Sequence, residues 1–363
     1  MNSKLYEGLR VVGAIAAKDV VDAVKNKTLL AIVLGVAVLV LSGQAMPWLL
    51  RLEARPLVVV YDEGKSRLAV ALKQSDDVRL RAVRTPQELE QTLGESGEPL
   101  LGLWLPADLD RRLESGGPVE LDGYLVHWAT SAEAAELRTF FEAKLTTLAG
   151  QEVRIRTEGH AVYPAAGAGG WPDMAAMTLV VAILSICGAV VPYLMIEEKE
   201  THTLDALLIS PASIGQVIGG KALAGAFYGL LAAGVVLVLN RRLVVHWQVA
   251  ILAAVCAAFF AVALGLLLGS LFDNAQSVGL WFGAALLVLL LPMLLRGYLA
   301  ANSPGLAGTL LRWLPSTLLV DAVKASFVAH VAWGEVLPGL GVVLASTALL
   351  LAVVIWWVRR TTR

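Results

Sequence analysis

Six long apolar stretches constrain the fold of this chain more than any other feature. A helix needs about 20 apolar residues to cross a membrane, because its backbone amides find no water in the hydrocarbon core. Six segments approach or exceed this length, and they cover residues 28–50, 174–196, 217–239, 249–272, 278–295 and 336–358. Only 16% of the 363 residues are charged and the mean hydropathy is +0.69, which excludes an ordinary soluble globule with about 25% charged residues. The sequence therefore predicts a polytopic α-helical membrane protein with six transmembrane helices.

The first stretch has a second interpretation as a secretory signal. Lys25 and Lys27 precede it, and residues 42–45 resemble a small-residue cleavage site. However, the segment ahead of it is much longer than the basic leader of a signal, and apolar character resumes at 46–50. We therefore expect a retained first transmembrane helix at 28–50, whereas cleavage would leave five spans.

Charge is concentrated between the first and second stretches, where residues 51–172 hold 33 of the chain's 59 charged residues. Branched and alternating apolar runs predict strands at 57–61, 78–83, 100–105, 119–127 and 153–156. Helical spacing predicts helices at 65–74, 86–93, 107–113 and 131–148. This alternation predicts an inserted α/β domain over 51–172. The Gly- and Ala-rich run 165–170 is expected to be a flexible connection back to the membrane.

The sequence indicates no metal site or catalytic site in residues 51–172, and no disulfide framework or nucleic-acid partner for the chain as a whole. His127 and His160 are far from other ligand-type residues in the sequence, so we expect ordinary polar side chains. Cys187 and Cys256 lie inside apolar runs, which excludes a disulfide framework. The net charge of −1 gives no argument for a nucleic-acid partner.

Lysine and arginine in the short loops predict the orientation, because these residues favour the cytoplasmic side. With the N-terminus inside, ten such residues lie inside and five outside. We therefore expect both termini in the cytoplasm, a cytoplasmic tail at 359–363, and residues 51–172 on the extracytoplasmic side. Residues 1–27 are predicted to form an interfacial helix, or alternatively a cytoplasmic helix packed on a partner. Its apolar face comprises Leu5, Leu9, Val12, Ala16, Val20 and Ala23.

A charged run and a short amphipathic helix lie between the second and third stretches. The charged run is 197–200, and Leu204, Leu207 and Leu208 then share one helix face. Pro211 is expected to end this helix, and residues 213–216 predict a capping box for the third span. Such a helix suits docking of a soluble partner, while a solvated loop whose leucines pack on the membrane face is the alternative.

This loop resembles the signature loop of ABC-type export permeases of the second bacterial class. In that family an E-x-G-T-L-E-x-L-L-x-S/T-P stretch precedes a G-K pair, which stands here at Gly220 and Lys221. His202 occupies the place that the family usually gives to glycine. The matching residues are Glu198, Glu200, Thr203, Leu204, Asp205, Leu207, Leu208, Ser210 and Pro211. The layout is similar too: one span, a large external domain, then a five-helix domain at 173–358 with outer-surface helices at 297–335.

The resemblance implies a permease subunit that pairs with a second copy or a related permease and with two copies of a separate ATP-binding-cassette ATPase. ATP and magnesium would belong to that partner, and this chain would hold no cofactor or metal. The cytoplasmic coupling loop 197–216 would contact the ATPase in a bacterial inner membrane. The implied contact residues are Glu197, Glu198, Lys199, Glu200, Thr203, Leu204, Asp205, Leu207, Leu208, Ser210 and Pro211.

Residues 215–222 nearly spell a phosphate-binding loop, but the pattern fails at its last position. Ala222 stands where a hydroxyl must ligate magnesium, and a transmembrane helix begins here without a preceding strand. We therefore expect no ATPase site in this chain, and hence no enzyme. Lys221 is interpreted as a cation that snorkels to the inner interface.

Small residues share one helix face in three places, which predicts close helix packing in lipid. These sets are Gly225 with Gly229, Gly279 with Gly283, and Ala261 with Gly265 and Gly269. Outside the spans, Asp321 and Lys324 are expected to pair at i, i+3 on an outer-surface helix, a pair worth a few tenths of a kcal/mol if it is exposed.

The leading functional hypothesis is an exporter subunit that moves a drug-like or amphiphilic molecule, or an ion, outward. An ion-coupled secondary transporter is disfavoured because no ionisable residue lies at the centre of a predicted span. The other alternative is a mechanotransmission subunit, in which ATP-driven motion moves the external domain and no substrate crosses the bilayer.

Overall fold

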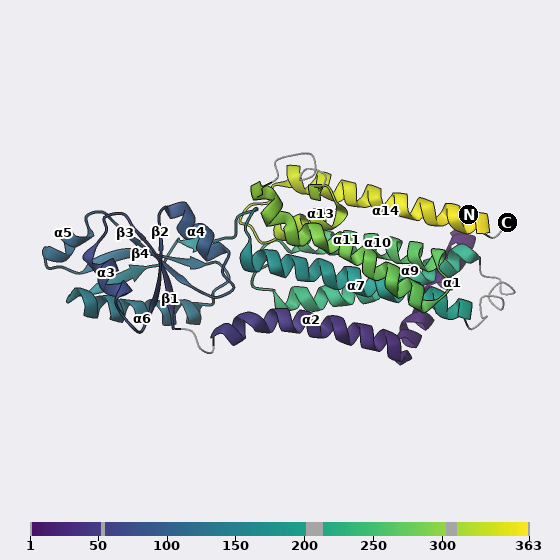
Figure 1. Ribbon diagram of the computed structural model, residues 1–363, viewed down its shortest axis with the longest axis horizontal. Coiled ribbons are helices and arrows are strands. Elements are labelled where there is room, and N and C mark those ends of the chain that lie inside the picture. Colours follow the sequence, from purple (N-terminus) through teal and green to yellow (C-terminus); the bar gives the residue numbers. More distant parts are fainter. Residues whose placement is uncertain (1, 52–54, 201–212, 303–310, 362–363) are drawn as a thin grey trace.

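The computed structural model describes residues 2–51, 55–200, 213–302 and 311–361, which form a bundle of long helices and an α/β domain at one end of it (Figure 1). The N-terminus and the last turns of the chain lie at the opposite end, here called the terminal end; the other is the domain end. The bundle comprises α1 (Asn2–Lys25), α2 (Lys27–Arg51), α7 (Gly170–Glu200), α9 (Ile214–Leu239), α10 (Trp247–Leu271), α11 (Ala275–Asn302), α13 (Pro315–Lys324) and α14 (Trp333–Thr361).

The bundle is that of a polytopic α-helical membrane protein. Five helices, α7, α9, α10, α11 and α14, are individually long and apolar enough to span a membrane. A sixth candidate is the pair Tyr6–Lys25 and Leu29–Gly43, which passes the same criterion together but is bent by 74°. Each predicted stretch coincides with one helix, except that the fourth runs one residue past α10, to its C-cap Phe272.

Small residues let α9 and α10 approach α7, which is the most deeply buried of the five spanning helices. A Cβ added at Gly265 would lie 3.1 Å from the carbonyl oxygen of Cys187, and one at Gly225 would strike Val191. The predicted packing faces of α9 and α10 are therefore confirmed. On α11 the prediction is wrong within the subunit, because an added Cβ at Gly279 or Gly283 has no described atom within 4 Å.

The α/β domain is a single mixed sheet covered by helices on both faces. Each predicted strand and helix is found, with boundaries within two residues, and the additional short strand β6 was not predicted. The strands are β1 (Leu57–Asp62), β2 (Arg79–Val83), β3 (Leu101–Leu105), β4 (Val119–Val126), β5 (Val153–Arg156) and β6 (Ala161–Val162). The helices are α3 (Arg67–Lys73), α4 (Pro86–Gly94), α5 (Leu109–Glu114) and α6 (Ser131–Ala149).

The sheet has the order β2-β1-β3-β4-β5, with β6 paired to β4. The β3–β4 pair is antiparallel, and the other pairs are parallel. Because side chains alternate along a strand, Val58 and Val60 face a core with α3 and α6, whereas Val59 faces the smaller core under α4. The domain is thus a three-layer α/β/α structure.

Helix α1 packs lengthwise on α9 through part of its predicted apolar face. Ala16 and Ala23 are buried and Val12 and Val20 are partly buried, but Leu9 is 62% exposed. The tight contact depends on a glycine in α9, since a Cβ at Gly220 would lie 2.5 Å from a methyl of Ile15 in α1. Placement of this helix at a membrane interface remains a prediction.

Candidate functional site

The predicted coupling loop is described only at its two ends. Residues 201–212, which include Thr203, Leu204, Asp205, Leu207, Leu208, Ser210 and Pro211, lie outside the described residues, as do the side chains of Glu198 and Glu200. Helix α7 continues through Glu200, so the first four residues of the predicted loop belong to the helix. Glutamate and lysine are good helix formers, so the helix continues beyond the end of the apolar segment. The structure thus fixes how the chain leaves α7 and enters α9.

Lys199 joins the last turn of α7 to the end of α10. Its Nζ donates to the carbonyl oxygens of Gly269 at 3.2 Å and Phe272 at 3.0 Å. It also forms an ion pair with Asp273 at 2.8 Å. Carbonyls at a helix C-terminus have no intrahelical partners and carry partial negative charge, so a lysine stabilises them. This contact holds the base of the loop against α10.

Glu197 joins the same turn of α7 to the bend between α1 and α2. The Asn26 amide donates to Glu197 Oε1 at 3.3 Å. The Asn26 side-chain oxygen also accepts from the Leu29 amide at 3.3 Å, which is an N-cap contact at the start of α2. One asparagine therefore both starts α2 and bonds to the end of α7.

The predicted capping box at the start of α9 is confirmed. Ser213 Oγ accepts from the Gln216 amide at 3.3 Å, and Gln216 Oε1 accepts from the Ser213 amide at 2.8 Å. This exchange satisfies two backbone donors that a helix start would otherwise leave open. The chain therefore re-enters the bundle at a fixed residue immediately after the loop.

Lys221 is buried, which corrects its interpretation as a snorkelling cation. It is 2% exposed, and its Nζ pairs with Asp19 at 3.4 Å and donates to the carbonyl oxygen of Leu194 at 2.9 Å. Asp19 is itself 2% exposed. The pair therefore ties α1, α7 and α9 together close to both loop ends. A nearby second link runs from the Tyr228 hydroxyl to the carbonyl oxygen of Val20 at 2.6 Å.

Sequence reasoning missed Asp19, although a signal for it exists. Asp19 follows Ala16 by three residues and Val12 by seven, so it lies on the predicted apolar face of α1. A carboxylate on such a face needs a buried partner, because an unpaired buried charge is costly. The G-K pair supplies that partner through Lys221.

A second buried lysine lies at the domain end. Lys324 of α13 is 4% exposed; it pairs with Asp173 in the first turn of α7 at 3.0 Å and donates to the carbonyl oxygen of Ala168. Lys324 is therefore buried, and the condition of exposure set for its pair with Asp321 is not met. The connection at 165–170, which was expected to be flexible, is held by hydrogen bonds to Glu95. The Gly169 amide donates to Glu95 Oε1 at 3.2 Å, and the Trp171 amide donates to the Glu95 carbonyl oxygen at 2.9 Å.

Two further contacts join the α/β domain to the bundle. Glu133, the N3 residue of the capping box of α6, accepts from Arg242 at 3.4 Å. His127 Nε2 lies 3.3 Å from the carbonyl oxygen of Leu243, and its ring stacks on Tyr163. Burial lowers the pKa of His127, opposed by its hydrogen bonds to backbone. The described residues contain no group of three metal-type ligands, whether at this junction or elsewhere.

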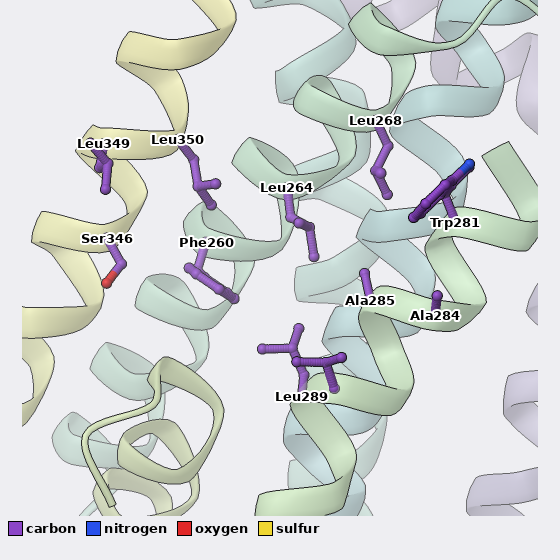
Figure 2. Close-up of a pocket in the computed structure, with 11 residues that line it drawn as sticks. Phe260, Leu264, Leu268, Trp281, Ala284, Ala285, Leu289, Ser346, Leu349 and Leu350 are labelled. Carbon is purple, nitrogen blue, oxygen red and sulfur yellow. The ribbon is translucent and has the colours of Figure 1, made fainter. Parts of the chain in front are cut away.

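An apolar recess opens between α10, α11 and α14. Its volume is about 470 Å³ (Figure 2). Leu264 and Phe260 of α10 point into it, as do Ala285 and Leu289 of α11. Its position within the spanning helices suits the hydrocarbon part of a bilayer.

The comparisons with known proteins agree with this architecture. The family model described as ABC-2 family transporter protein matches residues 27–356. The chain belongs to the ABC-2 transporter family. It is accordingly an ABC transporter permease subunit, a membrane-embedded chain of a family that generally works with a separate ATPase subunit and carries no ATPase site of its own. A search of curated proteins returned no match.

Proposed function

We propose that this chain is the membrane-spanning half of an ATP-driven exporter that moves an amphiphilic or drug-like molecule outward. Two copies, or one copy and a related permease, would work with two ATPase subunits that bind ATP and magnesium. The loop after α7 would dock on the ATPase through Glu197, Glu198, Lys199, Glu200, Thr203, Leu204, Asp205, Leu207, Leu208, Ser210 and Pro211. A bacterial inner membrane, with the termini in the cytoplasm, is the proposed location.

The anchoring of both loop ends carries this proposal. Glu197 and Lys199 fix the exit from α7, and the capping box at Ser213 fixes the entry into α9. The Lys221–Asp19 pair then joins these helices to α1. A movement of the loop would therefore be transmitted directly to α1, α7 and α9, because no flexible segment separates the loop ends from these helices.

The proposed orientation in the membrane rests on the distribution of lysine and arginine in the short segments. In the sequence, the short segments hold ten lysines and arginines inside and five outside if the N-terminus is cytoplasmic, and positive residues favour the cytoplasm. The ATPase would therefore meet the loop inside the cell, and the α/β domain would lie outside. Accessibility of single cysteines introduced at the exposed Val70 of the α/β domain and at Lys18 of α1 would test this.

The decisive experiment measures coupling between the loop and an ATPase. The chain is co-expressed with an ATP-binding-cassette ATPase from the same organism, and ATP hydrolysis and substrate accumulation are measured in inverted vesicles. We expect Leu207→Arg to abolish both recovery of the complex and stimulated hydrolysis. Val70→Arg, on an exposed surface of the α/β domain, is the matched control and should leave both unchanged.

The outcomes separate the candidate functions. Equal behaviour of the two variants would overturn the loop as the docking element. Stimulated hydrolysis without accumulation of any substrate in a broad panel would favour a mechanotransmission subunit, which works the α/β domain alone. Accumulation driven by an ion gradient without ATP would favour a secondary transporter.

A further inference from the structure

A polar recess of about 440 Å³ lies in the α/β domain, beside α4 and the paired strands β4 and β6. Glu90 of α4 lines one side, and Tyr124, His160 and Tyr163 line the others. In the described structure neither lysine nor arginine lines it. Aromatic rings around a carboxylate, without a competing basic side chain, form an environment that favours a cation.

The walls of this recess are held in place before any ligand arrives. The Leu125 amide donates to the carbonyl oxygen of His160 at 3.2 Å, and the His127 amide donates to that of Val162 at 2.9 Å. The His160 ring stacks on Tyr124 with centroids 4.8 Å apart and planes 13° apart. A site that is already ordered loses little conformational entropy on binding.

Two carboxylates lie near the Tyr124 phenol: Glu90, which lines the recess, and Asp122, which is paired with Arg156 at 2.6 Å. The pKa of Tyr124 is raised, first by burial and then by the negative charges of Asp122 and Glu90. Each of these effects disfavours a further negative charge at the phenol. The negative charge of Glu90 at the recess attracts a positively charged ligand.

The recess also borders the junction between the α/β domain and the bundle. Tyr163, which lines it, stacks on His127 with centroids 4.6 Å apart. His127 in turn contacts the carbonyl oxygen of Leu243, in the connection between α9 and α10. Two side chains, those of Tyr163 and His127, would therefore connect a ligand in the recess to the bundle.

We propose that this recess binds an organic ammonium ion, with Glu90 as its counter-ion and Tyr163 and His160 as ring walls. The volume accommodates a cation with a ring-sized apolar body. The acceptors at Glu90 and the Tyr124 hydroxyl suit the N–H donors of a protonated amine. The site depends on the α/β domain alone and does not rest on the export function proposed above.

The test uses the full chain in lipid nanodiscs and benzylammonium chloride at pH 7 as the probe, with binding measured by isothermal titration calorimetry. Benzyl alcohol and sodium benzoate have similar bodies but are neutral and anionic, so we expect the cation to bind more tightly than both. Glu90→Gln should lower the affinity for benzylammonium about two- to fivefold, as expected for one exposed charge pair. Glu136→Gln, which removes an exposed carboxylate from α6 on the opposite face of the sheet, should leave it unchanged.

Tyr124→Phe removes only the hydroxyl of Tyr124, whereas Tyr124→Leu also removes its ring, so the two variants separate the contributions of these groups to binding. Both variants are first checked for wild-type thermal unfolding. We expect Tyr124→Phe to retain the His160 stack and most of the binding, and Tyr124→Leu to lower it about two- to fivefold. Absence of benzylammonium binding, equal binding of benzoate, or equal effects of Glu90→Gln and Glu136→Gln would overturn the site. Leu207→Arg, which disables the loop in the proposed exporter, should not change benzylammonium binding, so the two proposals fail separately.

Discussion

At each end of the bundle a buried lysine contacts α7, but the surroundings of the two lysines differ. At the terminal end, Lys221 is enclosed by α1, α7 and α9 and pairs with Asp19, which is equally buried. At the domain end, Lys324 pairs with Asp173, whose side chain is 22% exposed. The first pair joins three helices at the loop, and the second joins α13 and α7 to the chain that leaves the α/β domain. A buried lysine therefore contacts α7 at each end, and the ion pair at the loop is the more deeply buried of the two.

Removing the lysine at the terminal end should have the largest effect. Lys221→Met removes the buried lysine that pairs with Asp19 and leaves the exposed Lys18 at 4.0 Å; loss of one member of a buried pair costs about 3–5 kcal/mol. Chemical denaturation in detergent would measure this loss in the free energy of unfolding. The double variant Asp19→Leu/Lys221→Met should recover most of it, because apolar residues can replace a buried pair. No recovery would mean that the ion pair is not the source of the loss.

The corresponding change at the domain end should be smaller. Lys324→Met removes the ion pair with Asp173 and the hydrogen bond to Ala168, but water reaches Asp173. We expect a loss of about 2–3 kcal/mol, in the range for a hydrogen bond to a charged group. Limited proteolysis should show cleavage appearing in 165–170, which the lysine holds in the native chain. An effect as large as that of Lys221→Met would remove the proposed difference between the ends.

The close packing of α10 against the middle of α7 can be tested by enlarging a glycine of α10. Gly265→Val places methyls against the Cys187 carbonyl and Val191, and forced overpacking costs about 1–3 kcal/mol. Gly283→Val on α11 is the matched control, since its added Cβ has no described neighbour within 4 Å. Thermal unfolding of the two variants should differ. Equal melting temperatures would show that α10 does not support α7 as closely as the structure indicates.

Acidification should affect the domain end through His127 and is expected to have the smallest effect. Its native pKa lies below the usual value of 6.5 because burial disfavours the charged ring. The unfolded state therefore binds the proton first, so stability falls as the pH drops below 6.5 towards the native pKa. Hydrogen exchange near Leu243 should increase over this range. His127→Phe retains a ring against Tyr163 and should remove that pH dependence; the same dependence in the variant would exclude His127 as its cause.

Much of the architecture was predictable because apolar length and periodicity are local properties. The six stretches, the strands and helices of the α/β domain and the capping box at Ser213 follow from residues close in sequence. The antiparallel placement of β4 and the short β6 were not predictable in this way, because pairing partners depend on the whole sheet. The extension of α7 through Glu200 was missed because the end of an apolar span is not the end of a helix.

The contacts at the candidate site were harder to predict than the elements that carry them. Asp19 and Lys221 are 202 residues apart, and Lys324 and Asp173 are 151 apart. No local pattern identifies such a partner. The charged residue on the apolar face of α1 indicated that a partner was needed, but not which lysine supplies it. The docking role of the loop rests on the resemblance and the family, and its contacts with an ATPase remain a prediction.

The order of the sheet has a consequence for copies of this protein crowded in one membrane. Among the described residues, strand β2 is paired only with β1, so its other edge offers backbone groups that a strand from a neighbouring copy could join. Arg79 and Arg81 are exposed along this strand. Charged residues on an edge strand oppose such addition, because a joining strand would have to bury or repel them. The β2 edge of the domain is thereby protected from edge-to-edge aggregation at high local density.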